Sequence, residues 1–257
     1  MPALNDLAVK LFADGADLET IAQMARHPLI KGFTTNPTLM RKAGVRDYRA
    51  FAREVLTVVP ERPVSFEVFS DDFSQMERQA LEIASWGRNV YVKIPVTNTD
   101  GTFSGPLIKR LAVAGVKVNV TALLSVAQVE QVAQCLAKPV PSFVSVFAGR
   151  IADTGRDPVP IMAKALEVLA ARPKAELIWA SPRELLNIFQ ADAIRCHVIT
   201  ATSDLLAKLP LVGKDLERFS LETVQMFRRD AVQAGYTIDV PPPAPPRTRH
   251  KAARVAS

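Results

Sequence analysis

This chain of 257 residues is poor in cysteine, since only Cys135 and Cys196 occur. Two cysteines are too few for a disulfide framework, and their scarcity indicates a reducing, cytoplasmic environment. No uninterrupted apolar stretch approaches the roughly 20 residues that a membrane-spanning helix needs, so no membrane span is expected. The first residues carry no basic segment followed by a long apolar one, so no secretory signal peptide is expected.

The histidines and glycines of the chain do not have the spacing that is typical of metal sites and nucleotide-binding sites. His27, His197 and His250 have no metal-ligand spacing with either cysteine, so no metal site is expected. No Gly-x-Gly-x-x-Gly motif follows the first predicted strand, and no Gly-x-x-x-x-Gly-Lys motif occurs anywhere. Nucleotide-binding folds therefore lose support.

Acidic residues are absent from the last 17 positions, which hold four of the basic residues. Without them the chain has 28 basic and 26 acidic residues, so the net charge of +6 belongs mostly to this tail. Its proline-rich start predicts an extended, disordered segment over residues 237–257, after a single domain over residues 1–236. A solvated tail is favoured over a nucleic-acid-binding one, because the basic segment is short.

Short apolar runs alternate with helical patterns from the first residues to about position 210. The predicted strands are residues 9–12, 32–35, 64–69, 90–96, 116–122, 143–147, 177–180 and 197–202. Strands that alternate with helices predict a parallel sheet, and eight such units predict an α/β fold, a single (β/α)₈ TIM barrel. An open doubly wound sheet is the alternative. An extra C-terminal helix is predicted over residues 213–234.

Lys93 lies in residues 89–96, a run that is otherwise typical of a buried parallel strand. Burial disfavours the ammonium form of a lysine, and a neutral amine in a pocket is a nucleophile for carbonyl carbon. The alternative is a lysine at the strand end that reaches water or pairs with an acid.

Polar residues gather where the predicted strands end, which is where a barrel of this kind builds its active site. In strand order they are Asp14, Thr34, Asn36, Glu67, Lys93, Asn119, Thr121, Ser145, Arg150, Ser181 and Arg183. An amine, two carboxylates, several hydroxyl and amide groups and two guanidinium groups suit a Schiff-base aldol reaction on a sugar phosphate.

Seven short motifs in a fixed order carry a family resemblance. They are KLFAD at 10–14, GFTTNP at 32–37, VSFEV at 64–68, VKIP at 92–95, NVT at 119–121, FAGR at 147–150 with Asp153, and AS at 180–181. On these motifs the chain resembles the transaldolases, in the branch that includes the small fructose-6-phosphate aldolases. The resemblance covers about residues 8 to 210.

The resemblance implies a role for each of these positions. Lys93 is expected to form the Schiff base, Asp14 to act as acid and base at the C3–C4 bond, and Glu67 and Thr121 to hold the catalytic water. The implied substrate-binding residues are Thr34, Asn36, Asn119, Ser145, Phe147, Arg150, Ser181 and Arg183, with the two arginines on the phosphate. No metal or organic cofactor is implied. Assembly of copies through the C-terminal helix, around residues 216–227, is also implied.

Glu67 and Phe147 bear on which reaction is expected. The fructose-6-phosphate aldolases resemble this chain but carry Gln and Tyr at these positions. A carboxylate at 67 and no phenol at 147 favour group transfer to a second aldehyde over release of free dihydroxyacetone.

The chain also departs from the family pattern. Gly15 and Asp17 stand where the family usually has Thr and Asn, Val146 where it has Pro, and Ala148 where it has Val. None of these changes removes an expected catalytic group, but together they fit a divergent subgroup whose substrate is not a pentose-pathway sugar.

The sequence leaves three functions open. The first is a transaldolase that moves a dihydroxyacetone unit between a ketose phosphate and an aldose phosphate. The second is an aldolase of the same fold that releases its products. The third is a barrel that kept the site by descent and serves as a structural or binding partner, against which the intact set of polar residues argues.

Overall fold

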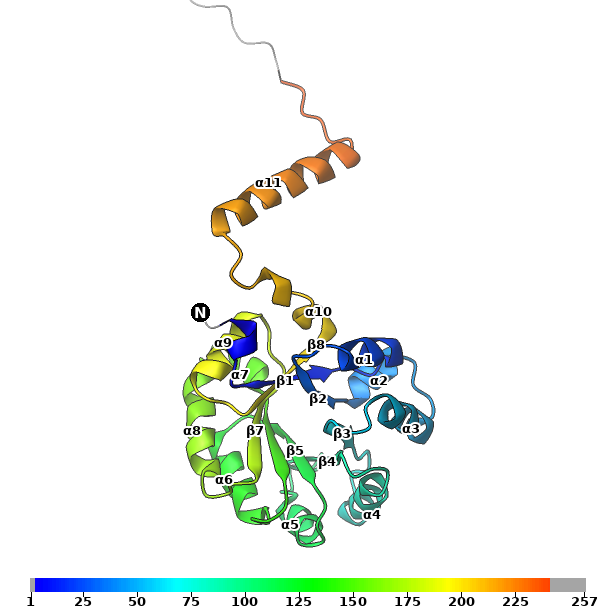
Figure 1. Cartoon of the computed structure of the whole chain (residues 1–257). Helices are drawn as coiled ribbons and strands as arrows, with labels where there is room; N and C mark the ends of the chain where they lie inside the picture. The colour runs from blue at the N-terminus through cyan, green and yellow to red at the C-terminus, as the bar shows by residue number, and fades with distance from the viewer. Residues whose placement is uncertain (1–2, 241–257) are drawn as a thin grey trace, which may run out of the picture. The chain divides into compact units, whose positions relative to one another are not determined.

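The computed structural model describes residues 3–240. Eight parallel strands form a closed barrel in the order β1 to β8, surrounded by helices (Figure 1). β1 pairs with β8, so the sheet has no edge. The prediction of a (β/α)₈ barrel is confirmed, and the open doubly wound alternative is wrong.

The bounds of the elements are as follows. The strands are β1 Lys10–Asp14, β2 Ile30–Thr34, β3 Val64–Glu67, β4 Val90–Pro95, β5 Val118–Leu123, β6 Ser142–Val146, β7 Ala175–Trp179 and β8 Val198–Thr202. The α-helices of the barrel are α1 Leu18–Ala25, α2 Pro37–Lys42, α3 Tyr48–Val58, α4 Phe73–Ala84, α5 Gly105–Val113, α6 Val126–Cys135, α7 Ala148–Ala152, α8 Val159–Leu169, α9 Leu186–Ala193 and α10 Ser203–Leu206. Two short 3₁₀ turns, η1 Leu4–Asp6 and η2 Leu209–Leu211, lie near its ends.

All eight predicted strands exist, with ends that differ by no more than two residues. β2 and β7 begin two residues before their predicted starts, because exposed Lys31 and partly exposed Glu176 interrupt the apolar pattern there. β3 ends two residues early, at Glu67. The apolar residues Val68 and Phe69 follow it, but they lie beyond the paired strand.

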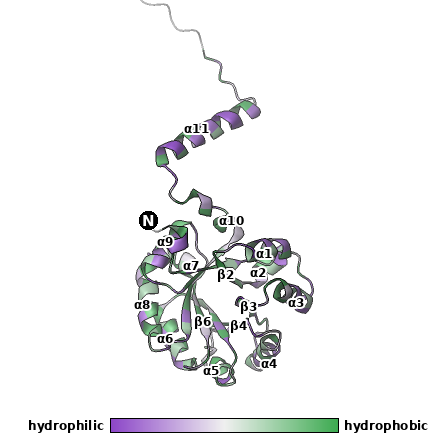
Figure 2. Ribbon diagram, viewed as in Figure 1, coloured by the Kyte–Doolittle hydropathy of each residue, from purple (hydrophilic) through white to green (hydrophobic). Residues whose placement is uncertain are grey.

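The chain forms two compact units, and the barrel is the first of them. The second begins at Gly213 and contains α11, Leu216–Gln233. Asp215 caps this helix by accepting a hydrogen bond from the Arg218 N–H. Hydrophobic and hydrophilic residues alternate along α11 (Figure 2). The predicted C-terminal helix is therefore present, somewhat shorter than residues 213–234. Of the tail predicted over residues 237–257, positions 241–257 lie outside the described residues.

No helix among residues 3–240 combines the length and the apolar character that a membrane crossing requires.

Two apolar regions build the barrel unit. The larger fills the space between the strands and the surrounding helices. The smaller lies inside the barrel and includes Phe12, Phe143, Ile178 and Val198, with the Phe12 and Phe143 rings edge to face at 5.6 Å. Gly32 leaves room for this packing, because a Cβ there would overlap the Phe12 ring. Residues two positions further along these strands point the same way. This smaller apolar cluster therefore lies directly beneath the polar side chains at the C-terminal ends of the same strands.

Gly149 allows the ends of β6 and β7 to approach each other. It lies in the first turn of α7, and its N–H donates to the Ala180 carbonyl. A Cβ at this position would overlap the backbone carbonyl oxygen of Ser181. Ser181 itself has a left-handed backbone, with φ of 60°. A backbone neighbour of this kind cannot rotate away as a side chain could.

We expect Gly149→Ala to lower the free energy of unfolding by about 1–3 kcal/mol, because the added methyl forces the start of α7 away from the Ser181 backbone. Urea unfolding curves of the full chain would measure it. Gly15→Ala is the control, since a Cβ at Gly15 meets nothing within 4 Å. Equal stabilities for the two variants would contradict the close approach.

Candidate active site

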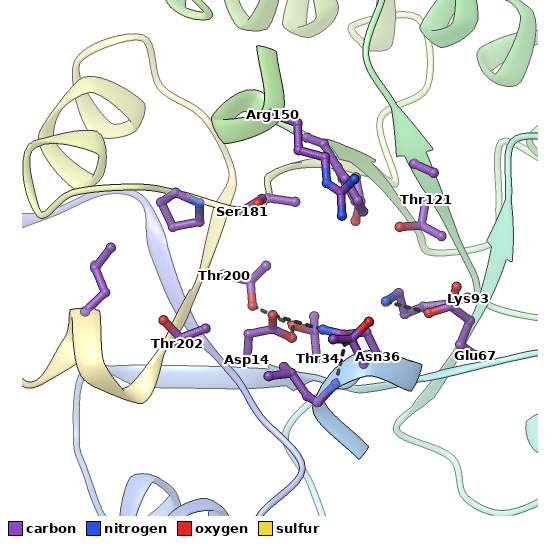
Figure 3. Close-up of a pocket in the computed structure, with 18 of the residues that line it drawn as sticks. Asp14, Thr34, Asn36, Glu67, Lys93, Thr121, Arg150, Ser181, Thr200 and Thr202 are labelled. Atoms are coloured by element: carbon purple, nitrogen blue, oxygen red, sulfur yellow. Dashed lines mark hydrogen bonds and ion pairs between the residues drawn. The ribbon is translucent and has the colours of Figure 1, made fainter. Parts of the chain in front are cut away.

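A cavity of about 600 Å³ opens at the C-terminal ends of the strands (Figure 3). Its lining includes eleven of the twelve side chains that the sequence nominates: Asp14, Thr34, Asn36, Glu67, Lys93, Thr121, Ser145, Phe147, Arg150, Ser181 and Arg183. They come from β1 to β6, from α7, and from the loops that follow β2, β6 and β7. The fold thus gathers in one place residues that are up to 169 positions apart in the sequence.

Lys93 is the buried cation of this cavity, with a side chain that is 8% exposed. Its Nζ lies 3.0 Å from Glu67 Oε2 and donates to the Thr35 carbonyl oxygen at 2.8 Å. Glu67 and Lys93 are direct partners in the β3–β4 ladder, so their side chains emerge side by side. The lysine does not reach out to bulk water. It pairs with an acid inside the cavity, which satisfies the buried charge.

Asp14 ends β1 on the other side of the cavity floor. Thr34 Oγ1 donates to its Oδ1 at 2.7 Å, and Asn36 Nδ2 donates to its Oδ2 at 3.3 Å. The Thr34 hydroxyl proton is used in this bond, so Thr200, whose Oγ1 lies 2.6 Å from Thr34 Oγ1, must be the donor to Thr34. A chain of two hydroxyls therefore holds the carboxyl in place.

Burial raises the pKa of Asp14 above its usual range, even though the charge of Lys93 and the hydrogen bonds from Thr34 and Asn36 lower it. The nearby Glu67 also raises this pKa. A carboxyl with a raised pKa takes up and releases a proton closer to neutral pH than an exposed aspartate does.

Asn119 is the one nominated residue that does not line the cavity. It is fully buried, its Nδ2 donates to Ser65 Oγ at 3.0 Å, and its Oδ1 accepts from Ser145 Oγ at 2.7 Å. Ser65 lies two residues before Glu67 on the same face of β3, so Asn119 reaches from this deeper layer up to Ser145 in the cavity lining. In the structure, Asn119 supports Ser145 from below.

Thr121 is held by an irregular stretch of β5. The next residue, Ala122, has a left-handed backbone with φ of 67°, and the β5–β6 register shifts at this point. Such a conformation is unfavourable for a residue with a Cβ, and it recurs at functional sites. The buried Thr121 hydroxyl has no hydrogen-bond partner among residues 3–240. It is therefore free to bind a molecule in the cavity.

Two arginines lie at the rim. The Arg150 guanidinium lies 5.5 Å from the centre of the Phe147 ring, in a cation–π arrangement. Arg183 forms an ion pair with Asp153, donating from Nε to Oδ1 at 2.9 Å. Both arginines face the cavity, and Asp153 fixes the orientation of one of them. A pair of guanidinium groups suits a phosphate.

Five polar residues of the lining are not among those that the sequence predicts. One is Thr38 in α2, and the others are Thr200 and Thr202 in β8, Asp204 in α10 and Lys208 just beyond that helix. Threonine is common in strands for its β-branched shape alone, so Thr200 and Thr202 carry no chemical signal. The rule that all eight strand ends contribute could have found them.

Comparisons of the sequence with known proteins agree on one family. The family model described as Transaldolase/Fructose-6-phosphate aldolase matches residues 11–239. A "Probable transaldolase" of Dehalococcoides mccartyi is 33% identical over 215 residues, which cover 82% of this chain and 96% of that protein. A "Probable transaldolase" of Methanococcus maripaludis is 34% identical over 215 residues, covering 82% and 95%.

Among solved structures, KGPDC from Streptococcus mutans superposes with a TM-score of 0.55. It covers 77% of this chain and 89% of that protein, at 10% sequence identity. A likeness at this level of identity concerns the barrel fold alone.

We expect Asp14→Asn to raise the melting temperature at neutral pH. The folded pKa of Asp14 is raised above the unfolded value of 3.8, so ionising the carboxylate destabilises the fold as pH rises through the folded pKa. Below pH 3.8 the carboxyl is protonated in both states, and the advantage of the variant disappears.

Thermal melts of Asp14→Asn and the parent chain from pH 3 to pH 8 would show whether the variant has the higher melting temperature at neutral pH. Asp17→Asn is the control, because hydrogen bonds from Thr20 lower the pKa of Asp17 and its ionised form stabilises the fold. A variant of Asp14 that is less stable than the parent chain at pH 8 would contradict the prediction.

Proposed function

Because the chain belongs to the transaldolase/fructose-6-phosphate aldolase family, we propose that it transfers a dihydroxyacetone unit from a ketose phosphate to an aldose phosphate through a Schiff base on Lys93. The observation that supports this best is the buried Lys93 amine, 3.0 Å from the Glu67 carboxylate on the cavity floor. An amine with an adjacent proton acceptor is the arrangement that nucleophilic attack on a carbonyl requires.

The first step joins Lys93 to the substrate. The ammonium passes a proton to Glu67, and the neutral amine attacks the C2 carbonyl of the ketose to give a carbinolamine. Glu67 returns the proton to the departing C2 hydroxyl, which leaves as water and leaves an iminium ion behind. The unpartnered Thr121 hydroxyl is suited to hold that water.

The second step breaks the C3–C4 bond. Asp14 takes the proton of the C4 hydroxyl, C4 becomes the aldehyde of the departing aldose phosphate, and the bonding electrons move into the iminium to form an enamine. The raised pKa of Asp14 suits a group that takes this proton and later returns it. The acceptor aldehyde then reverses the sequence, and hydrolysis frees Lys93.

The rim provides for the rest of the substrate. In the proposal, Arg150 and Arg183 bind the phosphate, and the polar side chains of Asn36, Ser145 and Ser181 face the sugar hydroxyls. Nothing in this scheme calls for a metal or an organic cofactor.

The second candidate is an aldolase of the same fold that releases dihydroxyacetone. Phe147 provides no hydroxyl at the rim, and its ring instead carries the Arg150 guanidinium. This favours retention of the enamine until an acceptor aldehyde arrives. Product analysis with and without an added aldose phosphate separates the two reactions.

The proposal is tested by borohydride trapping with fructose 6-phosphate and peptide mapping. A reduced three-carbon adduct is expected on Lys93, and Lys93→Ala is expected to lower kcat/KM by at least about 10⁴-fold, because the covalent route is lost. Lys10→Ala is the control, since Lys10 pairs with Glu176 and does not line the cavity. If a panel of ketose phosphates leaves no adduct on the folded parent chain, the proposed function is wrong.

We also propose that copies of the chain associate through α11. Leu216, Val224 and Phe227 are each at least 60% exposed on this helix, more apolar surface than an isolated solvated helix usually shows. Sedimentation velocity is expected to show an oligomer that Val224→Asp with Phe227→Asp converts to monomer. A monomeric parent chain would contradict this expectation.

A further inference from the structure

The ladder between β2 and β3 stops one step short of Glu67. Phe33 N–H donates to the Pro63 carbonyl, and Thr35 N–H donates to the Ser65 carbonyl. In a regular parallel ladder the next bond would run from the Glu67 N–H to the Thr35 carbonyl. That carbonyl instead accepts from Lys93 Nζ at 2.8 Å.

A tyrosine from a helix takes the missing place. The hydroxyl of Tyr48, the first residue of α3, accepts from the Glu67 N–H at 2.7 Å and donates to the Glu67 carbonyl at 3.1 Å. The Tyr48 hydroxyl thus forms hydrogen bonds with both the N–H and the carbonyl of Glu67, on the side of β3 that faces β2. Burial raises the pKa of Tyr48, so the phenol keeps its proton and remains a donor.

Tyr48 is itself fixed in place by aromatic packing. Its ring lies 4.6 Å from the Phe69 ring, 5.5 Å from that of Trp86 and 6.1 Å from that of Phe66, measured between centroids. Asp47 caps α3 directly before it. The hydroxyl is therefore held by a rigid group rather than by a mobile loop.

From this geometry we infer that Tyr48 is a positioning residue for the reaction. Its hydroxyl replaces the Thr35 carbonyl in the ladder and so leaves that carbonyl free to hold Lys93. It also fixes the backbone of Glu67, whose carboxylate lies on the other side of the Lys93 nitrogen. Both partners of the buried amine depend on this one phenol. The inference rests on the proposed function for its effect on rate, but not for its effect on Lys93.

Tyr48→Phe tests the inference because it removes the hydroxyl and keeps the aromatic packing. The Glu67 N–H then lacks a partner, and the Thr35 carbonyl is the nearest replacement along the ladder. We expect kcat for fructose 6-phosphate with an aldose phosphate acceptor to fall about tenfold. KM is expected to stay within about twofold, since the arginines at the rim are untouched.

A second measurement needs no sugar substrate. Reductive methylation of the full chain with formaldehyde and cyanoborohydride, read at Lys93 by peptide mapping, reports how firmly the ammonium is held. We expect Lys93 to react at least about threefold faster in Tyr48→Phe, because its partners are displaced. Labelling of exposed Lys164 provides the internal standard.

Trp86→Phe is the matched control, because it perturbs the same aromatic cluster but leaves the Tyr48 hydroxyl in place. It is expected to lower the melting temperature without changing kcat or Lys93 labelling. If Tyr48→Phe behaves like this control, the inference is wrong. If the parent chain shows no activity but Lys93 labelling still responds to Tyr48→Phe, the proposed function fails and the positioning role stands.

Discussion

At the C-terminal ends of the strands, the structure depends on keeping the Lys93 ammonium group away from water. A buried cation is tolerated only when oxygen atoms surround it, and Lys93 obtains one from the Glu67 side chain and one from the Thr35 backbone. Glu67 ends β3, the neighbour of the lysine's own strand β4, and Thr35 directly follows β2, the next strand along. The early end of the β2–β3 ladder follows from this requirement, because a carbonyl cannot serve the sheet and the lysine in the same direction.

Other polar groups of the cavity are also held by hydrogen-bond partners from the barrel itself. Asp14 is held by two successive threonine hydroxyls, and Ser145 is held by the buried Asn119 amide. Asp14 and Ser145 therefore each have a partner that orients them, whereas the buried Thr121 hydroxyl has none among residues 3–240. Such fixed side chains favour chemistry that needs little rearrangement when the substrate arrives.

Much of this arrangement could be predicted from the sequence, since strand periodicity and the rule for strand ends identify Asp14, Glu67 and Lys93 together. The depth of a residue within the barrel could not, which is why the sequence predicts Asn119 at the substrate although it lies beneath Ser145. The contribution of Tyr48 could not be predicted either. It acts from a helix on backbone atoms, and no side-chain motif records such a contact.

The hydrogen bond from Lys93 to the Thr35 carbonyl has a consequence for how this site tolerates change. Every amino acid offers the same main-chain oxygen, so one of the two oxygens that hold the Lys93 nitrogen is encoded by the path of the chain and not by the identity of residue 35. Replacing the side chain of residue 35 alone would leave this contact in place. Only a change that bends the backbone, or a distant residue that competes for the same oxygen, would reveal it.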